Sequence, residues 1–294
     1  MKRLFLSLCI LATSTACSSS EVHFVRKPLH IDVQADLPVQ VNETSGFAVI
    51  NNRVWTHNDS GGKNEIYQLS PDYKTVTKTV SIKGNKNYDW EDLTQDERYL
   101  YVGDTGNNST RRNGGVIYKL RISDVEKYHS VMPYNVIRYQ FKNFHKAKTY
   151  QHNFDSEAIA SVGDKIWLFS KNWNDEQSQL YVLSKSAQRQ LLKPVATYPT
   201  AGLITGADYN PQTQTMALVG YRKDMLLGYA FIWLVKVKND RLDWSTAVYK
   251  RLGIYGQWEG IHWDGVDKLL LTTEKNPLTK ALIGTVDVSF YTNK

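Results

Sequence analysis

Acidic residues at the edges of apolar stretches are the residues of this 294-residue sequence that could do chemistry. Some of them open a short apolar stretch, and others follow directly after one. The candidate ligand residues are Asp59, Glu91, Asp104, Glu157, Asp208 and Glu259, and the candidate rim residues are Lys171, Trp173, Arg222 and Glu274. Carboxylates that share one site repel each other unless they are protonated, paired or bound to a cation. Because carboxylate oxygens suit hard ions, the set predicts a site for Ca²⁺ or another divalent cation.

The same residues also have a structural interpretation. An Asp or Glu at the start of a strand can accept hydrogen bonds from backbone N–H groups and brace its neighbours. Trp90, Trp173 and Trp258 flank the acidic positions and could form an aromatic rim for a sugar or another flat polar ligand. For Trp90 and Trp258 we favour packing between neighbouring sheets, and we expect Trp55, Trp167 and Trp233 in the core.

The elements that carry these residues recur as a unit of alternating short strands. Each unit has an opening tripeptide, an apolar strand, a polar loop and a third strand rich in aromatic residues. The openings begin at Ser45, Glu91, Glu157, Gly206 and Glu259, and fourth strands are expected at 77–82, 136–141, 191–197 and 245–251. The fifth unit lacks a fourth strand, whereas residues 29–34 form a spare strand ahead of the first unit.

This pattern predicts an all-β fold, a β-propeller of five four-stranded blades that residues 29–34 close by joining the last blade. Six blades remain an alternative, since residues 123–154 could hold an extra element; a β-sandwich is a weaker one. Residues 29–294 would form a single domain. In a propeller the first strand of each blade lines the central channel, and its start lies on the same face as the loop between strands two and three. The acidic residues should therefore meet at one mouth of the channel.

Histidine and serine chemistry is weakly indicated. His57 precedes Asn58 and Asp59 and could serve as a base at the mouth. His145 and His152, with Asp155, lack a standard zinc spacing and are expected to be solvated loop residues. No Gly-x-Ser-x-Gly motif is present, so a serine hydrolase has no support.

The N-terminus has the pattern of a bacterial lipoprotein signal. Lys2 and Arg3 precede an apolar run too short to span a bilayer, and small residues follow up to Cys17. This lipobox-like pattern implies a signal peptide over residues 1–16, lipidation (palmitate included) of Cys17, and a polar tether over residues 17–28. Ser18, by analogy with other lipoproteins, implies sorting to the outer membrane. The formal net charge of +7 is spread without a basic block, which disfavours nucleic-acid binding.

The repeats Trp90-Glu91-Asp92-Leu93 and Trp258-Glu259-Gly260-Ile261, with THNDSGG and VGDTGNN, give the sequence a family likeness. It resembles exported bacterial β-propeller lipoproteins related at fold level to gluconolactonase and NHL-type propellers. That resemblance implies a divalent metal in the channel, with Glu91, Glu157 and Glu259 in the place of the metal-binding glutamate. The leading interpretation is a lipid-anchored module that binds a small-molecule, glycan or protein ligand. The alternatives are a metal-dependent hydrolase, lactonase-like or phosphoesterase, and a glycoside hydrolase.

Overall fold

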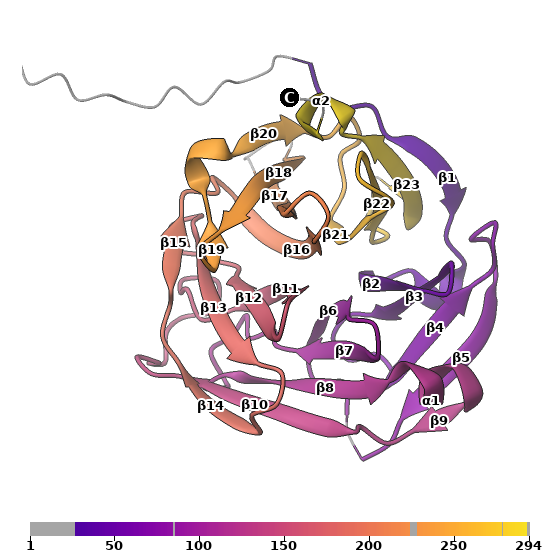
Figure 1. Cartoon of the computed structure of the whole chain (residues 1–294), viewed down its shortest axis with the longest axis horizontal. Helices are drawn as coiled ribbons and strands as arrows, with labels where there is room; N and C mark the ends of the chain where they lie inside the picture. Colours follow the sequence, from indigo (N-terminus) through magenta and orange to yellow (C-terminus); the bar gives the residue numbers. More distant parts are fainter. Residues whose placement is uncertain (1–26, 85, 224–227, 278, 293–294) are drawn as a thin grey trace, which may run out of the picture.

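Five mainly antiparallel sheets surround a central axis in the computed structural model, which describes residues 27–84, 86–223, 228–277 and 279–292 (Figure 1). The first blade contains β2 (Thr44–Ile50), β3 (Arg53–Asn58), β4 (Glu65–Leu69) and β5 (Val76–Ile82). The second contains β6 (Trp90–Gln95), β7 (Tyr99–Asp104), β8 (Gly115–Arg121) and β10 (Asn135–Phe141). The third contains β11 (Ser156–Val162), β12 (Lys165–Ser170), β13 (Ser178–Ser184) and β15 (Ala196–Tyr198).

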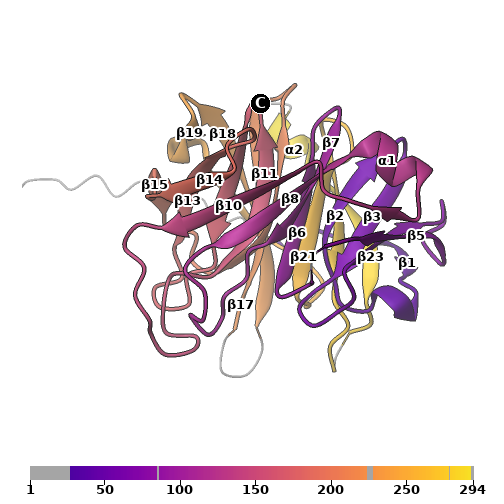
Figure 2. The ribbon, with the colours of Figure 1, turned by 90° about the horizontal axis from the view of Figure 1, so that it is seen from below.

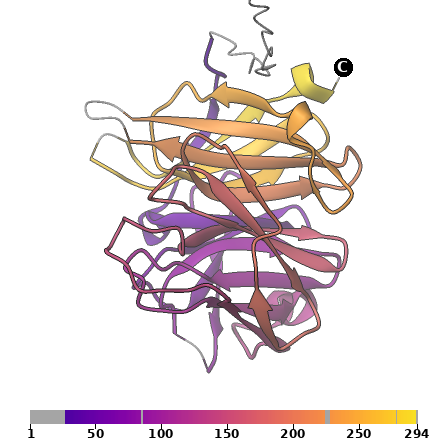
Figure 3. The same ribbon diagram turned by 90° about the vertical axis from the view of Figure 1, so that its left-hand side faces the viewer.

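The last two blades complete the ring. The fourth contains β16 (Leu203–Asn210), β17 (Thr215–Arg222), β18 (Tyr229–Lys238) and β20 (Val248–Arg251), with the short β19 (Arg241–Leu242) beside β18. The fifth contains β21 (Trp258–Trp263), β22 (Lys268–Thr273) and β23 (Leu282–Asp287), and its outer strand is β1 (Asp32–Asp36). The predicted five-bladed propeller is therefore confirmed, as is its closure by an N-terminal strand. Seen from the side, the sheets lie one above another, from the fourth and fifth blades (orange and yellow) at the top to the first and second (purple) at the bottom (Figure 3).

Three strand predictions need correction. The closing strand begins at Asp32, because Leu29 instead forms a parallel bridge with Leu252 of the fourth blade. Residues 191–197 do not form one strand. Pro194 lacks a backbone N–H and divides them, so that β14 (Arg189–Leu192) pairs with β10 of the second blade and β15 completes the third. The strand expected over 245–251 begins at Val248, after a short 3₁₀ helix at Trp244–Thr246.

Residues 123–154 do not contain a sixth blade. Within this stretch the structure has most of helix α1 (Ile122–Lys127), the short strand β9 (Ser130–Val131) and β10. Strand β9 pairs in parallel with β5 and so ties the first blade to the second. The remaining elements are the 3₁₀ helix Val39–Val41 and the C-terminal helix α2 (Ser289–Thr292). None of the described helices is long and apolar enough to cross a membrane.

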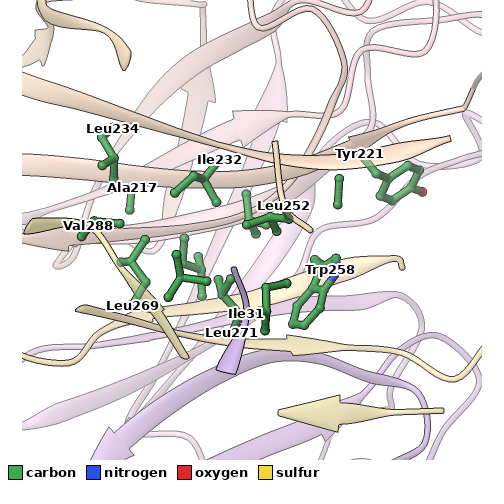
Figure 4. Close-up of a cluster of buried hydrophobic side chains, with 14 of the residues drawn as sticks. Ile31, Ala217, Tyr221, Ile232, Leu234, Leu252, Trp258, Leu269, Leu271 and Val288 are labelled. Atoms are coloured by element: carbon green, nitrogen blue, oxygen red, sulfur yellow. The ribbon is translucent and has the colours of Figure 1, made fainter. Parts of the chain in front are cut away.

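The core lies between neighbouring blades. Figure 4 shows one such layer, where Ile232 and Leu234 of β18 face Leu269 and Leu271 of β22. Trp90 and Trp258 are fully buried in two of these layers, in agreement with the packing interpretation. Burying a Trp side chain contributes about 4–6 kcal/mol of hydrophobic free energy. The tryptophans expected in the core, Trp55, Trp167 and Trp233, are buried as well.

The innermost strand of every blade contains an irregularity at the same place. The pairing register shifts at 44–47, 90–92, 156–158, 204–206 and 258–260, that is, near the start of each strand. A β-bulge leaves one residue outside the ladder and turns its side chain to a new direction. The bulged positions hold Ser45, Glu91, Glu157, Thr205 and Glu259, all buried. Five equivalent bulges thus place one polar side chain per blade around the axis.

Candidate functional site

The three bulged glutamates lie in a pocket of about 420 Å³ at one mouth of the channel. Asp59, Asn108, Lys171 and Trp173 come from the loops between the second and third strands of the first three blades, and these loops lie on the lower side of the ring in Figure 2. Its lining consists of Asp59, Glu91, Asn108, Tyr150, Glu157, Lys171, Trp173, Tyr221, Lys223, Gln257 and Glu259. All five blades therefore contribute residues to the pocket. The fourth blade, whose bulge holds Thr205, contributes Tyr221 of β17 and Lys223 directly after it.

Glu91 is at the centre of the acidic residues. One carboxylate oxygen each of Asp59, Asp89 and Glu91 lie within 4.8 Å of one another, and so do those of Glu91, Asp155 and Glu157. Glu91 is 3% exposed, yet no described residue donates a hydrogen bond to its carboxylate. The Oε2 atom of Glu259 is also buried without a hydrogen-bond partner among the described residues. Buried, unpartnered carboxylate oxygens are costly unless something binds them.

Asp89 and Asp155 were not predicted as members of this site. Each stands two residues before a bulged glutamate, in Asp89-Trp90-Glu91 and Asp155-Ser156-Glu157, and the fifth blade has Gln257 in that position. The two carboxylates of each pair belong to the same acidic group. The repeated Asp-x-Glu pattern is a sequence signal that could have identified both aspartates.

Lys171 neutralises one glutamate of the pocket. Its Nζ atom lies 2.6 and 2.5 Å from the two carboxylate oxygens of Glu157, and the pair is buried. Burial alone would lower the pKa of Lys171, but the negative charges of Glu157 and its neighbours outweigh that effect and hold the pKa well above its usual value. The lysine is therefore charged, and it satisfies Glu157 without satisfying Glu91.

Burial, together with electrostatic repulsion, raises the pKa of the other acids. Burial, followed by the nearby charges of Glu157 and Asp59, raises the pKa of Glu91 well above its usual value. Burial and the charge of Asp59 raise the pKa of Asp89 to about 7 and that of Glu274 to about 8. A cation in the mouth would reverse these shifts, because it favours the ionised carboxylates.

Aromatic rings form one wall of the pocket. The indole N–H of Trp173 donates a hydrogen bond of 2.7 Å to the Asp155 carboxylate, which fixes the ring at the mouth. Tyr150 packs against it edge to face, with 4.6 Å between the ring centroids. The Nζ atom of Lys223 lies 5.6 Å from the centroid of Trp173 and 5.5 Å from that of Tyr221. The wall thus presents flat apolar surface beside an acidic floor.

Two of the predicted ligand residues lie outside this pocket. The carboxylate of Asp104 forms an ion pair with Arg112 and accepts a hydrogen bond from Tyr118, so it is directed into the second blade. Asp208 is three residues past the bulge of its strand, where Thr205 takes the expected place. Its carboxylate accepts a hydrogen bond from the Trp263 backbone N–H at 2.8 Å. The fourth unit has Thr205 where three other units have a glutamate, so its predicted opening began one residue late, at Gly206.

The remaining predicted residues lie at the edge of the site. The Arg222 guanidinium is 3.4 Å from the Glu176 carboxylate and does not line the pocket. Glu274 accepts a hydrogen bond of 3.1 Å from Gln257 and borders Glu259. Cys17 lies outside the described residues, as do the rest of the predicted signal peptide and most of the tether.

The histidines have structural roles. His57 is completely buried, and burial lowers its pKa to about 4, so it is neutral and enclosed rather than available as a base at the mouth. His145 is exposed as expected, but His152 is buried and contacts the carbonyl oxygen of Asn108 at 2.7 Å. His152 therefore braces the loop that precedes Asp155.

The comparisons with known proteins agree with the fold. No protein-family model matches the sequence, and no curated protein matches it either. Among solved structures, the chain is similar to a hypothetical protein from Leishmania major, with 8% identity, a TM-score of 0.50 and 92% of each chain covered. It is also similar to the RRP9 WD40 repeats (10% identity, TM-score 0.43, 82% of this chain and 79% of that one) and to U3-55K (10%, 0.42, 83% and 67%). The protein is a β-propeller, and likeness at this level of identity extends to the fold alone.

Proposed function

We propose that this protein is a lipid-anchored ligand-binding module of the bacterial cell envelope whose acidic central mouth binds its ligand through a divalent cation. The observation that carries the proposal is the Glu91 carboxylate, which is buried among other acids without a hydrogen-bond donor in the described part of the chain. A carboxylate in that position needs a proton or a cation. The described residues that line the pocket include more acids than lysines, so the lysines cannot neutralise all of the carboxylates.

The donor set fits Ca²⁺. Asp59, Asp89 and Glu91 would hold the ion, since one oxygen of each already lies within 4.8 Å of the others. Asp155 adjoins Glu91, and its oxygens already accept hydrogen bonds from Asn107 N–H and the Trp173 indole. A bound Ca²⁺ would neutralise the carboxylates and offer free coordination positions to ligand oxygens. Glu157 is less available because Lys171 occupies both of its oxygens. Trp173 and Tyr150 would then pack against a flat part of the ligand.

Binding is favoured over hydrolysis by the composition of the pocket. None of the described residues that line it is a serine, a cysteine or a histidine, and His57 is enclosed behind it. A metal-dependent hydrolase remains the second candidate, because a cation held by carboxylates can activate water. The lipobox-like pattern that ends in Cys17 supports the lipid anchor. Ser18, the next residue, favours the outer membrane.

Elemental analysis of the purified protein, paired with melting curves in EDTA and in excess Ca²⁺, tests the proposal. We expect a stoichiometric divalent metal and a melting temperature that EDTA lowers and Ca²⁺ restores. No metal and identical melting curves would overturn it and leave the carboxylates with a structural role. Turnover of lactones or phosphoesters that EDTA abolishes, and that Asp89→Asn reduces without loss of folding, would instead favour the hydrolase.

A further inference from the structure

A second cleft, of about 610 Å³, lies at the outer edge of the second blade, away from the acidic mouth. Its lining consists of Arg112, Asn113, Gly114, Gly115, Val116, Arg138, Tyr139, Gln140, Arg189, Gln190 and Leu191. None of these residues is acidic. We refer to this cleft as the arginine cleft.

Two like charges are forced together in it by the strand pairing. Strands β10 and β14 run in parallel, and Arg138 is the direct partner of Arg189 in their register. Direct partners on adjacent strands point to the same face of a sheet, and like charges in that position destabilise it. Both arginines are exposed, and neither forms an ion pair with any described residue. On the other side of Arg138, its partner in β8 is Val116, and the partner of Val116 in β7 is Asp104. The Asp104 carboxylate is already paired with Arg112.

The cleft is held in place by contacts that do not use these two arginines. Gln190 forms two hydrogen bonds with the backbone of Ser184, and this fixes β14 against β13. The side-chain oxygen of Asn113 accepts a hydrogen bond from the Phe141 N–H at 3.0 Å, which leaves its amide N–H groups available. Gly114 has φ of +93°, and a Cβ there would lie 2.0 Å from the Tyr139 carbonyl oxygen. The turn can therefore approach β10 only as glycine, and the floor of the cleft stays open.

We propose that the arginine cleft binds a phosphate monoester group through Arg138 and Arg189. The planar guanidinium group donates paired hydrogen bonds that match the oxygens of a phosphate. One dianion between the two side chains would replace their repulsion with attraction. Leu191, which is 63% exposed, and Val116 supply apolar surface beside the charges for the organic part of the ligand. The volume is that of a small-molecule site.

The test compares Arg138→Gln/Arg189→Gln with Arg53→Gln/Arg98→Gln. The control removes two exposed arginines elsewhere on the surface and so matches the change in net charge. Binding to the purified full-length protein is measured with inorganic phosphate, with glycerol 3-phosphate, and with phosphatidylcholine vesicles that contain phosphatidic acid. We expect the first variant to bind at least about tenfold more weakly and the control to bind like the wild type.

The outcomes separate the source of the phosphate from the existence of the site. If the first variant loses only glycerol 3-phosphate binding, the ligand is a soluble phosphate ester; if it loses only vesicle binding, the ligand is a lipid headgroup. Both of these outcomes require that the control still binds like the wild type. Equal weakening in both variants, or no binding of any probe by the wild type, overturns the proposal. Melting curves provide the folding control: relief of repulsion should raise the melting temperature of the first variant by about 1–2 °C in phosphate-free buffer.

Discussion

Replacing Glu91 by Gln should make the protein more stable without metal and insensitive to Ca²⁺. The substitution keeps the size of the side chain and removes a negative charge that the described residues leave unpaired. In EDTA the remaining acids repel each other less, so the free energy of unfolding should rise. In Ca²⁺ the variant lacks the carboxylate shared by both groups of potential ligands, so the ion should no longer stabilise it.

The magnitude follows from the geometry of the cluster. Two unit charges 4.8 Å apart interact by about 3.5 kcal/mol at an effective dielectric constant of 20. Burial and the neighbouring acids raise the pKa of Glu91, so part of this repulsion is already relieved by protonation. We therefore expect a gain of about 1–2 kcal/mol in EDTA, or about 2–6 °C in melting temperature. Wild-type protein at a Ca²⁺ concentration of 100 times Kd should gain about 2.7 kcal/mol, or about 5–10 °C.

Differential scanning calorimetry of the wild type, Glu91→Gln and the control Glu97→Gln measures these shifts. Glu97 is an exposed carboxylate that does not line the acidic mouth, so its variant should respond to Ca²⁺ like the wild type. A Glu91→Gln protein that melts below the wild type in EDTA would show that Glu91 has a stabilising structural partner. An unchanged response to Ca²⁺ would show that the ion binds elsewhere.

Three further substitutions test other features of the protein. Lys171→Met should destabilise the protein by about 3–5 kcal/mol in chemical denaturation, because it leaves Glu157 buried and unpaired, and adding Glu157→Gln should restore most of the loss. Gly206→Ala should lower the free energy of unfolding by about 1–3 kcal/mol, since its Cβ would lie 1.9 Å from the Glu259 carbonyl oxygen; an unchanged melt would mean that the blades can separate there. Cys17→Ser should abolish metabolic labelling with palmitate and release the protein from the membrane fraction, whereas continued labelling would place the lipid elsewhere.

The strand openings indicate part of the acidic site but not all of it. Glu91, Glu157 and Glu259 could be predicted because they open equivalent apolar stretches, and the repeat relates those stretches to one another. Asp208 could not be placed correctly, since its strand has Thr205 at the bulge and nothing local distinguishes the two alignments. Asp104 precedes a polar loop as the true mouth residues do, but Arg112, eight residues later, directs it into the blade.

The sequence by itself determined the class of fold, the number of blades and the way in which the ring closes, because alternating apolar residues and a recurring unit are local properties of the chain. It also determined that acidic residues would gather at one mouth. Only the tertiary structure decided which acids meet, that Asp89 and Asp155 join them, and that Lys171 satisfies Glu157 while Glu91 stays unpaired. The reason is that bulges and ion pairs across blades depend on contacts between residues far apart in sequence, and those contacts exist only in the closed ring. The pairing of Arg138 with Arg189 is likewise a tertiary contact, since β14 crosses from the third repeat to the edge of the second blade.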